Sequence, residues 1–122
     1  PLIEPAMIDQ AIRPFLTDNS LKMGTLKSRI RQQDDLLSPN LVKVVTDGDD
    51  NALYFSRSPI PFYRDSWQTL QSPDFKPEQQ PCFKHVGLYV YRRDFLLEYA
   101  GWPQTFLEVT EKLDSCVPLK MA

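Results

Sequence analysis

Hydrophobic positions in the first part of the chain recur with the spacing of an amphipathic helix. Pro5 suits the first turn of a helix, where its missing N–H costs nothing. Four apolar residues then follow at the i, i+3, i+4 and i+7 positions of one face: Ile8, Ala11, Ile12 and Phe15. This pattern predicts a helix from about Pro5 to Leu16 with one buried face.

Three later segments have the composition of β-strands. Leu21 to Leu26 is a possible strand, and Leu41 to Val45 is a better one because β-branched residues flank a single lysine. Asp47-Gly48 is a turn signal, and it leads into a third candidate strand, Ala52 to Ser56. The last two strands are therefore predicted to form a β-hairpin.

Between Ser58 and Pro81 the pattern changes, because five prolines remove backbone donors and exclude helix interiors. The segment is predicted to be a long loop, called the Pro-rich loop below. Unstructured connections of this length are uncommon in compact domains and are often binding loops or subunit contacts. A plain surface excursion is the alternative.

After this loop the period changes from that of a strand to that of a helix. Val86 to Tyr91 is predicted to be a buried strand, and Arg92 to Tyr99 a helix that Gly101 is placed to end. Thr105 and Glu108 have the spacing of a capping box. They predict a last helix with an apolar face made of Phe106, Val109 and Leu113.

Strands that alternate with helices favour an α/β fold, and the hairpin and the Pro-rich loop argue against a purely parallel sheet.

A length of 122 residues fits one small domain with one core. No apolar run approaches the roughly 18 residues of a membrane span. The net charge of -2 argues against the broad basic surface of a nucleic-acid binder. Cys82 and Cys116 match no metal-ligand spacing and fit a reducing cytoplasm.

The densest polar cluster lies between Tyr54 and Arg64, where a predicted strand ends in a proline-stiffened turn. Arg57 and Arg64 bracket this turn and could converge. The planar guanidinium group presents a fork of donors that matches carboxylate or phosphate, so two of them suit an acidic small molecule. The alternative is a pair of solvated surface arginines.

His85 is the one histidine in the chain, and it precedes an apolar strand. Tyr89 follows four residues later, so both side chains are predicted to point to the same face. Either could donate or accept a hydrogen bond with a hydroxylated ligand. A structural hydrogen bond is the commoner role for such a histidine, and ligand contact is favoured over catalysis.

Three acidic residues recur every three positions on the predicted last helix, at Glu108, Glu111 and Asp114, and so lie on neighbouring parts of its surface. The capping box accounts for Glu108. A carboxylate at Asp114 could accept sugar hydroxyls, although a solvated helix face is the commoner arrangement. The four glycines are scattered and form no phosphate-binding loop.

Several segments resemble one enzyme family. The stretch NLVKVVTDGDDNALYFSRSPIPFYRD (40–65) and the stretch KHVGLYVYRRDFL (84–96) are similar to those of the 3-deoxy-manno-octulosonate cytidylyltransferases. The resemblance extends to the WP-x-T-x-LE run at Trp102 to Glu108. It also includes PLIEPAMID at the start of the chain, which resembles the stretch after that family's Q-G-D-E motif. Nearly everything up to about Leu113 is covered.

The resemblance implies an enzyme, a CMP-Kdo synthetase, with a sugar-nucleotidyltransferase fold that has a Rossmann-like mixed sheet. It implies transfer of CMP from CTP to Kdo, the acidic sugar 3-deoxy-D-manno-octulosonate, with release of pyrophosphate. The expected cofactor is Mg²⁺, the expected assembly a homodimer, and the expected location the cytoplasm, where the product would serve lipopolysaccharide biosynthesis. No nucleic-acid or membrane partner is expected.

The family motifs assign Kdo contacts to particular residues of this chain. Arg57 and Arg64 match positions that contact the sugar acid, and His85 and Tyr89 match positions that complete its pocket. Asp114 stands where the family has a glutamate that binds sugar hydroxyls, and the next position, Ser115, departs from the family's glutamine. No catalytic residue and no metal ligand is expected within the chain.

The match predicts a single partial domain over residues 1–122, the sugar-acid-binding and dimer-forming half of such an enzyme. The family's nucleotide-binding loop and both metal-binding aspartates have no counterpart here, so the chain alone is expected to be inactive. The segment Cys116 to Ala122 is an atypical tail, because Pro118 interrupts a helix that continues in the family.

Two other functions are compatible with the sequence. The first is a non-enzymatic interaction module, in which the Pro-rich loop with Phe62, Tyr63 and Trp67 contacts a protein partner, since aromatic residues and arginine are enriched in interface cores. The second is a related cytidylyltransferase that acts on another acidic sugar.

Overall fold

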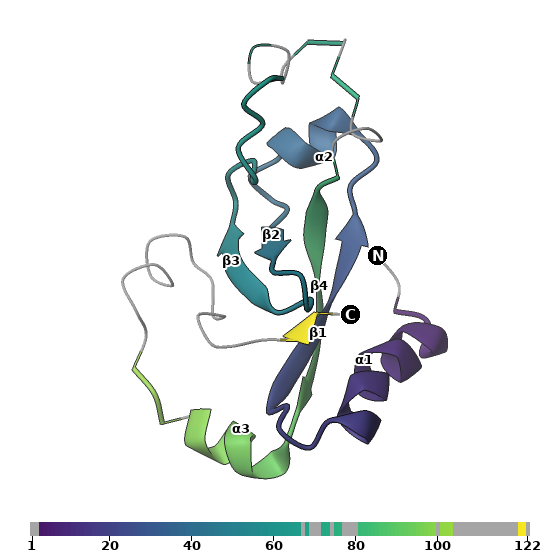
Figure 1. Cartoon of the computed structure of the whole chain (residues 1–122), viewed down its shortest axis with the longest axis vertical. Helices are drawn as coiled ribbons and strands as arrows, with labels where there is room; N and C mark the ends of the chain where they lie inside the picture. The colour runs from purple at the N-terminus through teal and green to yellow at the C-terminus, as the bar shows by residue number, and fades with distance from the viewer. Residues whose placement is uncertain are drawn as a thin grey trace.

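The computed structural model describes residues 3–66, 68, 72–73, 75–76, 81–99, 101–103 and 120–121. Its elements, shown in Figure 1, are α1 (Pro5–Thr17), β1 (Met23–Arg29), α2 (Gln33–Leu37), β2 (Lys43–Thr46), β3 (Ala52–Ser56), β4 (Phe83–Tyr91), α3 (Arg93–Tyr99) and β5 (Lys120–Met121). Within the described part of the chain, the helices are too short or too polar to cross a lipid bilayer.

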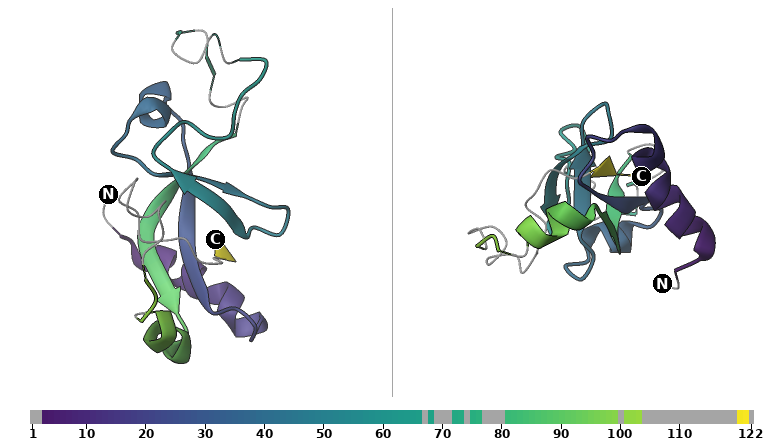
Figure 2. Two further views of the ribbon diagram at one scale, coloured as in Figure 1. Left: turned by 90° about the vertical axis from the view of Figure 1, so that its left-hand side faces the viewer. Right: turned by 90° about the horizontal axis from the view of Figure 1, so that it is seen from below.

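The strands form one five-stranded sheet in the order β3-β2-β4-β1-β5. The pairs β1–β4, β4–β2 and β2–β3 are antiparallel, whereas β5 runs parallel to β1. Figures 1 and 2 show α1 on one side of the β1–β4 pair and α3 on the other, near its lower end. The predicted α/β fold with a mixed sheet is therefore confirmed.

Helix α1 confirms the first predicted helix and is one residue longer at its end. Ala11 and Phe15 are buried, but Ile8 and Ile12 remain 43% and 37% exposed. The helix contacts β1 and β4, so these strands cover one side of the apolar stripe and leave the other side to solvent. The prediction of one buried face is therefore right for Ala11 and Phe15 and wrong for Ile8 and Ile12.

Pairing with neighbours sets the bounds of the two central strands. Strand β1 begins at Met23 and continues through the polar segment to Arg29, and β4 begins at Phe83 instead of Val86. The two strands are paired along this whole length. The sequence-based bounds were shorter because the polar residues at the end of β1 lack strand character, and their pairing with β4 overrides this preference.

A bulge interrupts the ladder between β1 and β4. Thr25 pairs with Tyr89 and the next residue, Leu26, with Val86, so two residues of β4 have no partner on β1. An even number of extra residues preserves the alternation of faces, and His85 therefore remains on the same face as Tyr89. The predicted shared face is confirmed, although the strand between His85 and Tyr89 contains this bulge and is not regular.

The predicted hairpin is confirmed, with β3 at the predicted bounds. Its turn is organised by the Asp47 carboxylate, whose Oδ1 accepts the backbone N–H groups of Asp49 and Asn51 at 2.9 Å each. The residue with a left-handed backbone is Asp50, with φ of 62°, and not Gly48. Aspartate tolerates this conformation better than most residues, so the turn forms without a glycine at that position.

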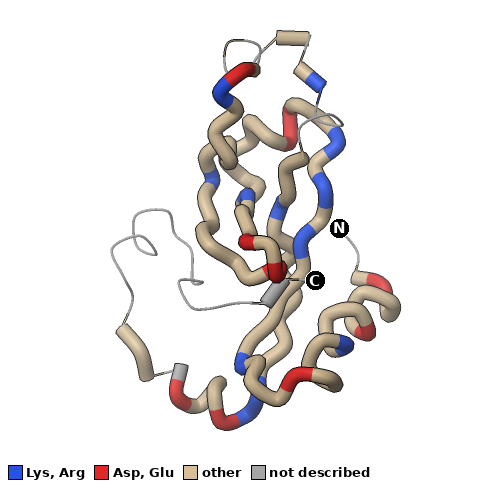
Figure 3. Tube along the Cα trace, viewed as in Figure 1, with Lys and Arg blue, Asp and Glu red and all other residues tan. Residues whose placement is uncertain are grey.

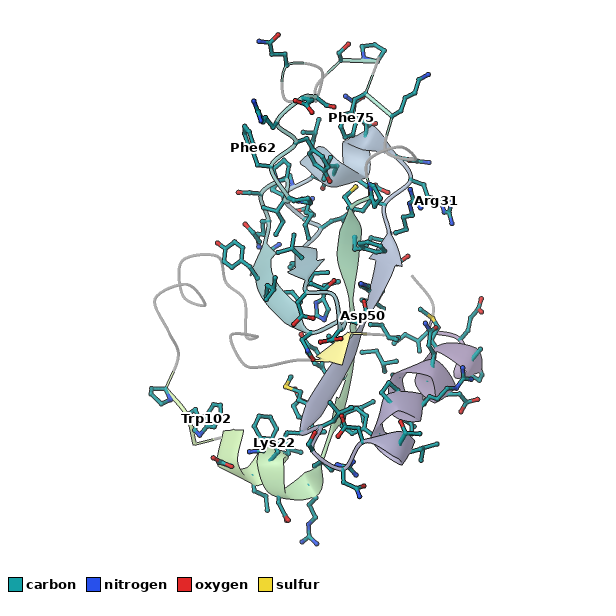
Figure 4. All side chains as sticks on the ribbon, in the orientation of Figure 1. Lys22, Arg31, Asp50, Phe62, Phe75 and Trp102 are labelled. Carbon is teal, nitrogen blue, oxygen red and sulfur yellow. The ribbon has the colours of Figure 1, made fainter. Side chains whose placement is uncertain are left out.

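Helix α2 was not predicted, because one turn of five residues is too short to show a hydrophobic period. Packing accounts for its formation, since Leu36 is completely buried. It belongs to a second core beside the Pro-rich loop, and Figure 4 shows Phe75 against α2. This core consists of Ile30, Leu36, Phe75 and Cys82, flanked by Leu37 and Tyr63.

The main core lies on one face of the sheet. Its fully buried members are Met23, Val44, Phe55 and Phe95, and the half-buried residues against it are Val42, Ala52, Phe83, Tyr89 and Tyr91. The expectation of one core is therefore wrong. Phe75 and Tyr63 of the Pro-rich loop pack into the separate second core with Ile30, Leu36 and Cys82.

Helix α3 confirms the prediction, starting one residue later, at Arg93. It ends at Tyr99, and the N–H of Gly101 donates to the carbonyl of Glu98 at 3.1 Å. No described glycine has a positive φ, so the predicted glycine stop does not use a left-handed backbone. The predicted helix from Thr105 to Leu113 lies outside the described residues, and β5 belongs to the predicted atypical tail.

Lys43 is a lysine with no exposed surface. Its Nζ donates to three backbone carbonyls, of Ser38, Leu41 at 2.9 Å and Arg57 at 2.7 Å. These acceptors match the three donors of an ammonium group. Burial, and secondarily the charge of Arg57, lower the pKa of Lys43. The residue fastens the segment before β2 to the end of β3.

Arg92 fastens α1 to the sheet. Its Nε donates to the carbonyl of Leu21 at 3.0 Å, and its Nη2 donates to the carbonyls of Phe15 and Asp18 at 3.1 Å each. The guanidinium carbon also lies 5.2 Å from the centre of the Phe15 ring, a cation–π contact. The end of α1 is thereby held against the junction of β4 and α3.

Candidate functional site

The candidate site is centred on His85, near the start of β4. The imidazole makes edge contacts with Phe55 on β3 and with Tyr89 further along β4, each with ring centroids 5.2 Å apart. Tyr89 in turn stacks on Tyr91 at 5.9 Å. These rings restrict the side chain of His85 and give the site an apolar wall with polar tips.

Thr25 on β1 completes this group, which we call the His85 cluster: Thr25, Phe55, His85 and Tyr89. The Oγ1 atom of Thr25 lies 2.8 Å from Nε2 of His85, and Thr25 is only 1% exposed. Sequence reasoning missed this residue. Its role depends on the antiparallel register of β1 with β4, and no local pattern in the sequence reports that register.

Burial lowers the pKa of His85 from 6.5 to about 4. The ring is therefore neutral at physiological pH, with one nitrogen that donates and one that accepts. A neutral imidazole suits the recognition of hydroxyl groups. It does not act as a cation toward a carboxylate, a task that falls to arginine.

His85 is expected to titrate near pH 4 in the folded protein and near pH 6.5 when unfolded. Between these values the unfolded state binds more protons. The contribution of His85 to the free energy of unfolding is thus fully present above pH 6.5 and is lost as the pH falls toward 4. Proton NMR of the one histidine, with the urea-unfolded chain as reference, measures both values. A folded-state pKa near 6.5 would contradict the burial of the ring.

Arg57 follows the end of β3 and is half-buried. Its Nη1 donates to the carbonyl of Pro39 at 2.9 Å, so the guanidinium group is anchored from one side. Arg64 lies seven residues later, exposed on the Pro-rich loop, beyond a cis bond between Ile60 and Pro61. The convergence of the two arginines on one ligand stays a prediction.

Asp114, together with Glu108 and Glu111, lies outside the described residues, so the arrangement predicted for the last helix stays untested. Among the described residues, no group of three or more histidine, cysteine, aspartate and glutamate side chains could hold a metal ion. Of the two cysteines, Cys82 is a buried free thiol in the second core. Burial raises the pKa of this thiol, so it is held as a neutral group.

Figure 3 shows several basic residues along the upper part of the molecule, and one of them lies beside the His85 cluster. Lys27 pairs with His85 across the β1–β4 ladder and so lies on the same face. Its Nζ is 3.0 Å from Oδ1 of Asp50 and also contacts Thr46 and the ring of Phe83. Figure 4 shows Asp50 reaching the middle of β1 from the hairpin turn. Lys27 therefore secures the hairpin.

The described site contains hydroxyls, a neutral imidazole and cations, and it has the donors and acceptors to bind a hydroxylated acid. The Thr25 hydroxyl lies beside the His85 base, but it is buried and also contacts the carbonyls of Val86 and Leu88, so it is not exposed to a substrate. The arrangement fits recognition and positioning of a ligand, and it fits poorly with covalent catalysis.

Comparison with known proteins shows the family of the chain. The family model described as Cytidylyltransferase matches residues 1–120. The chain is 66% identical to a 3-deoxy-manno-octulosonate cytidylyltransferase of Trichlorobacter lovleyi and 67% identical to one of Pelobacter propionicus. Each match covers 93% of this chain and 45% of the relative. The chain thus spans less than half the length of these relatives.

A solved structure is also similar, that of CMP:2-keto-3-deoxy-manno-octonic acid synthetase complexed with CTP. It is 31% identical, with a TM-score of 0.82, and the match covers 100% of this chain and 48% of that chain. The strand and helix arrangement described above is therefore that of part of a nucleotidyltransferase.

Proposed function

Because the chain belongs to the cytidylyltransferase family, we propose that it supplies the sugar-acid-binding part of an enzyme that transfers CMP from CTP to Kdo. The observation that carries this proposal is the identity of 66% and 67% to two 3-deoxy-manno-octulosonate cytidylyltransferases over 93% of the chain. The His85 cluster supports it independently, because the neutral imidazole and the Tyr89 hydroxyl can form hydrogen bonds with a polyhydroxylated ligand.

In the proposed reaction, a sugar hydroxyl oxygen attacks the α-phosphorus of CTP, and the bond from that phosphorus to the pyrophosphate oxygen breaks. The residues of this chain bind and orient the sugar. Arg57 and Arg64 hold the carboxylate, while His85, Tyr89 and Asp114 hold hydroxyls. Orientation of the attacking group is a large part of catalysis in such transfers.

Further properties of the whole enzyme belong to the same proposal. Mg²⁺ would neutralise phosphate charge. Its ligands are proposed to belong to the family's metal-binding motifs, which have no counterpart in this sequence. We also propose a homodimer located in the cytoplasm that serves lipopolysaccharide biosynthesis. The 122 residues alone are proposed to be inactive, because they span 45% of the relatives.

Binding of Kdo tests the site directly. In calorimetry, Kdo is expected to bind the chain, and Arg57→Ala or Arg64→Ala is expected to weaken binding about 30-fold or more, since loss of a charged partner of a carboxylate costs about 2 kcal/mol or more. Arg93→Ala is the matched control, because Arg93 is exposed on α3. Unchanged affinity in both site variants would refute the assignment, and equal binding of a sialic acid would point to another acidic sugar.

Mixing the chain with CTP, Kdo and Mg²⁺ tests the second part of the proposal. No release of pyrophosphate above background is expected, and a full-length relative serves as positive control. Turnover by the 122 residues alone would show that the catalytic residues are present in them.

One observation favours the interaction module as a second candidate. Phe62 on the Pro-rich loop is 66% exposed and lies where a partner could cover it. Tyr63, by contrast, packs edge-on against Phe75 in the second core, and Trp67 lies outside the described residues. Tight self-association in sedimentation, with no binding of Kdo, would favour this function over the first.

A further inference from the structure

We propose that Thr25 is a positioning residue, which holds His85 with Nε2 as the donor and thereby makes Nδ1 the hydrogen-bond acceptor of the site. The assignment of the ring state follows from the geometry alone. Its use, to accept a hydrogen bond from a hydroxyl of an acidic sugar, rests on the function proposed above.

A count of protons around the Thr25 hydroxyl carries the assignment. Oγ1 lies 2.7 Å from the carbonyl oxygen of Leu88, 3.1 Å from that of Val86 and 2.8 Å from Nε2 of His85. Neither carbonyl can donate, and the hydroxyl has one proton. That proton goes to a carbonyl, and the closer one is that of Leu88. The contact with His85 is then a hydrogen bond only if Nε2 carries a proton and donates it to Oγ1.

The bulge in β4 explains why these carbonyls face Thr25. Leu88 lies within the interruption of the β1–β4 ladder and has no partner on β1, and Val86, which pairs with Leu26, borders it. Oγ1 and the carbonyl oxygen of Leu88 are 2.7 Å apart, and two oxygen atoms this close require a proton between them. The bulge therefore places the carbonyl of Leu88 where it accepts the hydroxyl proton of Thr25. Because that proton is then unavailable to His85, the imidazole itself must carry its proton on Nε2.

The surroundings hold both partners in place. The backbone of Thr25 is paired with Tyr89 on one side and with Met121 of β5 on the other. The ring of His85 is bounded by Phe55 and Tyr89. A neutral imidazole has one N–H, so a proton fixed on Nε2 leaves the lone pair on Nδ1. Among the described residues, the hydrogen bond recorded for this ring is the one through Nε2.

The presence of one histidine makes the state of the ring directly measurable. In a long-range proton–nitrogen NMR spectrum of the ¹⁵N-labelled chain at pH 7, a single ring is expected, with Nε2 protonated and Nδ1 unprotonated. Thr25→Val keeps the shape but removes the hydroxyl, and it is expected to produce a mixture of the two tautomers. Thr25→Ser restores the hydroxyl and is expected to restore the single form.

Binding of Kdo to the same three proteins completes the test. Thr25→Val is expected to weaken binding about 10-fold, the value of roughly one hydrogen bond, and Thr25→Ser to recover most of it. A ring protonated on Nδ1 in the unmodified chain overturns the proposal, whether or not the valine variant folds. A single Nε2–H form that becomes a mixture in Thr25→Val, with no binding of Kdo, overturns the sugar-binding function but confirms that Thr25 positions the ring.

Discussion

Replacing Lys43 with methionine is expected to lower the free energy of unfolding by about 2–4 kcal/mol, the largest effect of any substitution considered. Methionine fills nearly the same volume but donates no hydrogen bond. The buried carbonyls of Leu41 and Arg57 lose the ammonium donor, and each such loss costs about 1–3 kcal/mol. The carbonyl of Ser38 keeps the backbone N–H of Leu41, at 3.3 Å.

The loss is smaller than that of three full hydrogen bonds, because the variant also removes the cost of burying a charge. Urea denaturation at pH 7 measures the change, with Lys22→Met as matched control. Lys22 is exposed, and its replacement is expected to change the stability by less than about 0.5 kcal/mol. Equal stability of the two variants would mean that the carbonyls of Leu41 and Arg57 find other donors.

Arg92→Met is expected to lower the free energy of unfolding by about 2–3 kcal/mol and to loosen α1 selectively. The guanidinium group donates to three carbonyls, and two of these, of Phe15 and Asp18, lie at the end of that helix. Hydrogen bonds to charged groups contribute about 1.5–3 kcal/mol each, but these share one side chain and are not additive.

Hydrogen exchange shows where the effect of this variant is felt. Faster exchange is expected in α1, while the amides of the β2–β3 hairpin stay protected as in the unmodified chain. The control is Arg93→Met, a replacement of the neighbouring exposed arginine, which is expected to leave exchange unchanged. Uniform loss of protection over the chain would show that Arg92 supports the whole fold rather than one helix.

Much of this fold could be predicted from local patterns. The period of 3.6 located α1 and α3, and the Asp47-Gly48 signal located the hairpin, because these elements depend on residues close in sequence. The polar end of β1 and the single turn of α2 could not be predicted in this way. Both exist because distant segments pack on them, β4 in one case and the Pro-rich loop with Phe75 in the other.

The candidate site also combines residues that local patterns predict with residues that depend on distant contacts. A spacing of four residues predicted that His85 and Tyr89 share a face, and the structure confirms this with rings 5.2 Å apart. Thr25 was missed, because its hydrogen-bond partner His85 lies 60 residues away in the sequence and no local pattern connects the two. The ligand contact of Arg57 stays a prediction from its chemistry, and its anchoring to Pro39 is a tertiary contact that only the structure reveals.

The long-range pairing of β1 with β4 has a kinetic consequence. The hairpin of β2 and β3 closes a short loop and can form within microseconds, whereas Thr25 meets His85 only after a loop of 60 residues has closed. The ladder between β1 and β4 is therefore expected to form late in folding. Until it does, the histidine has neither its threonine partner nor its buried environment, so recovery of its low pKa during refolding would report the last step of assembly.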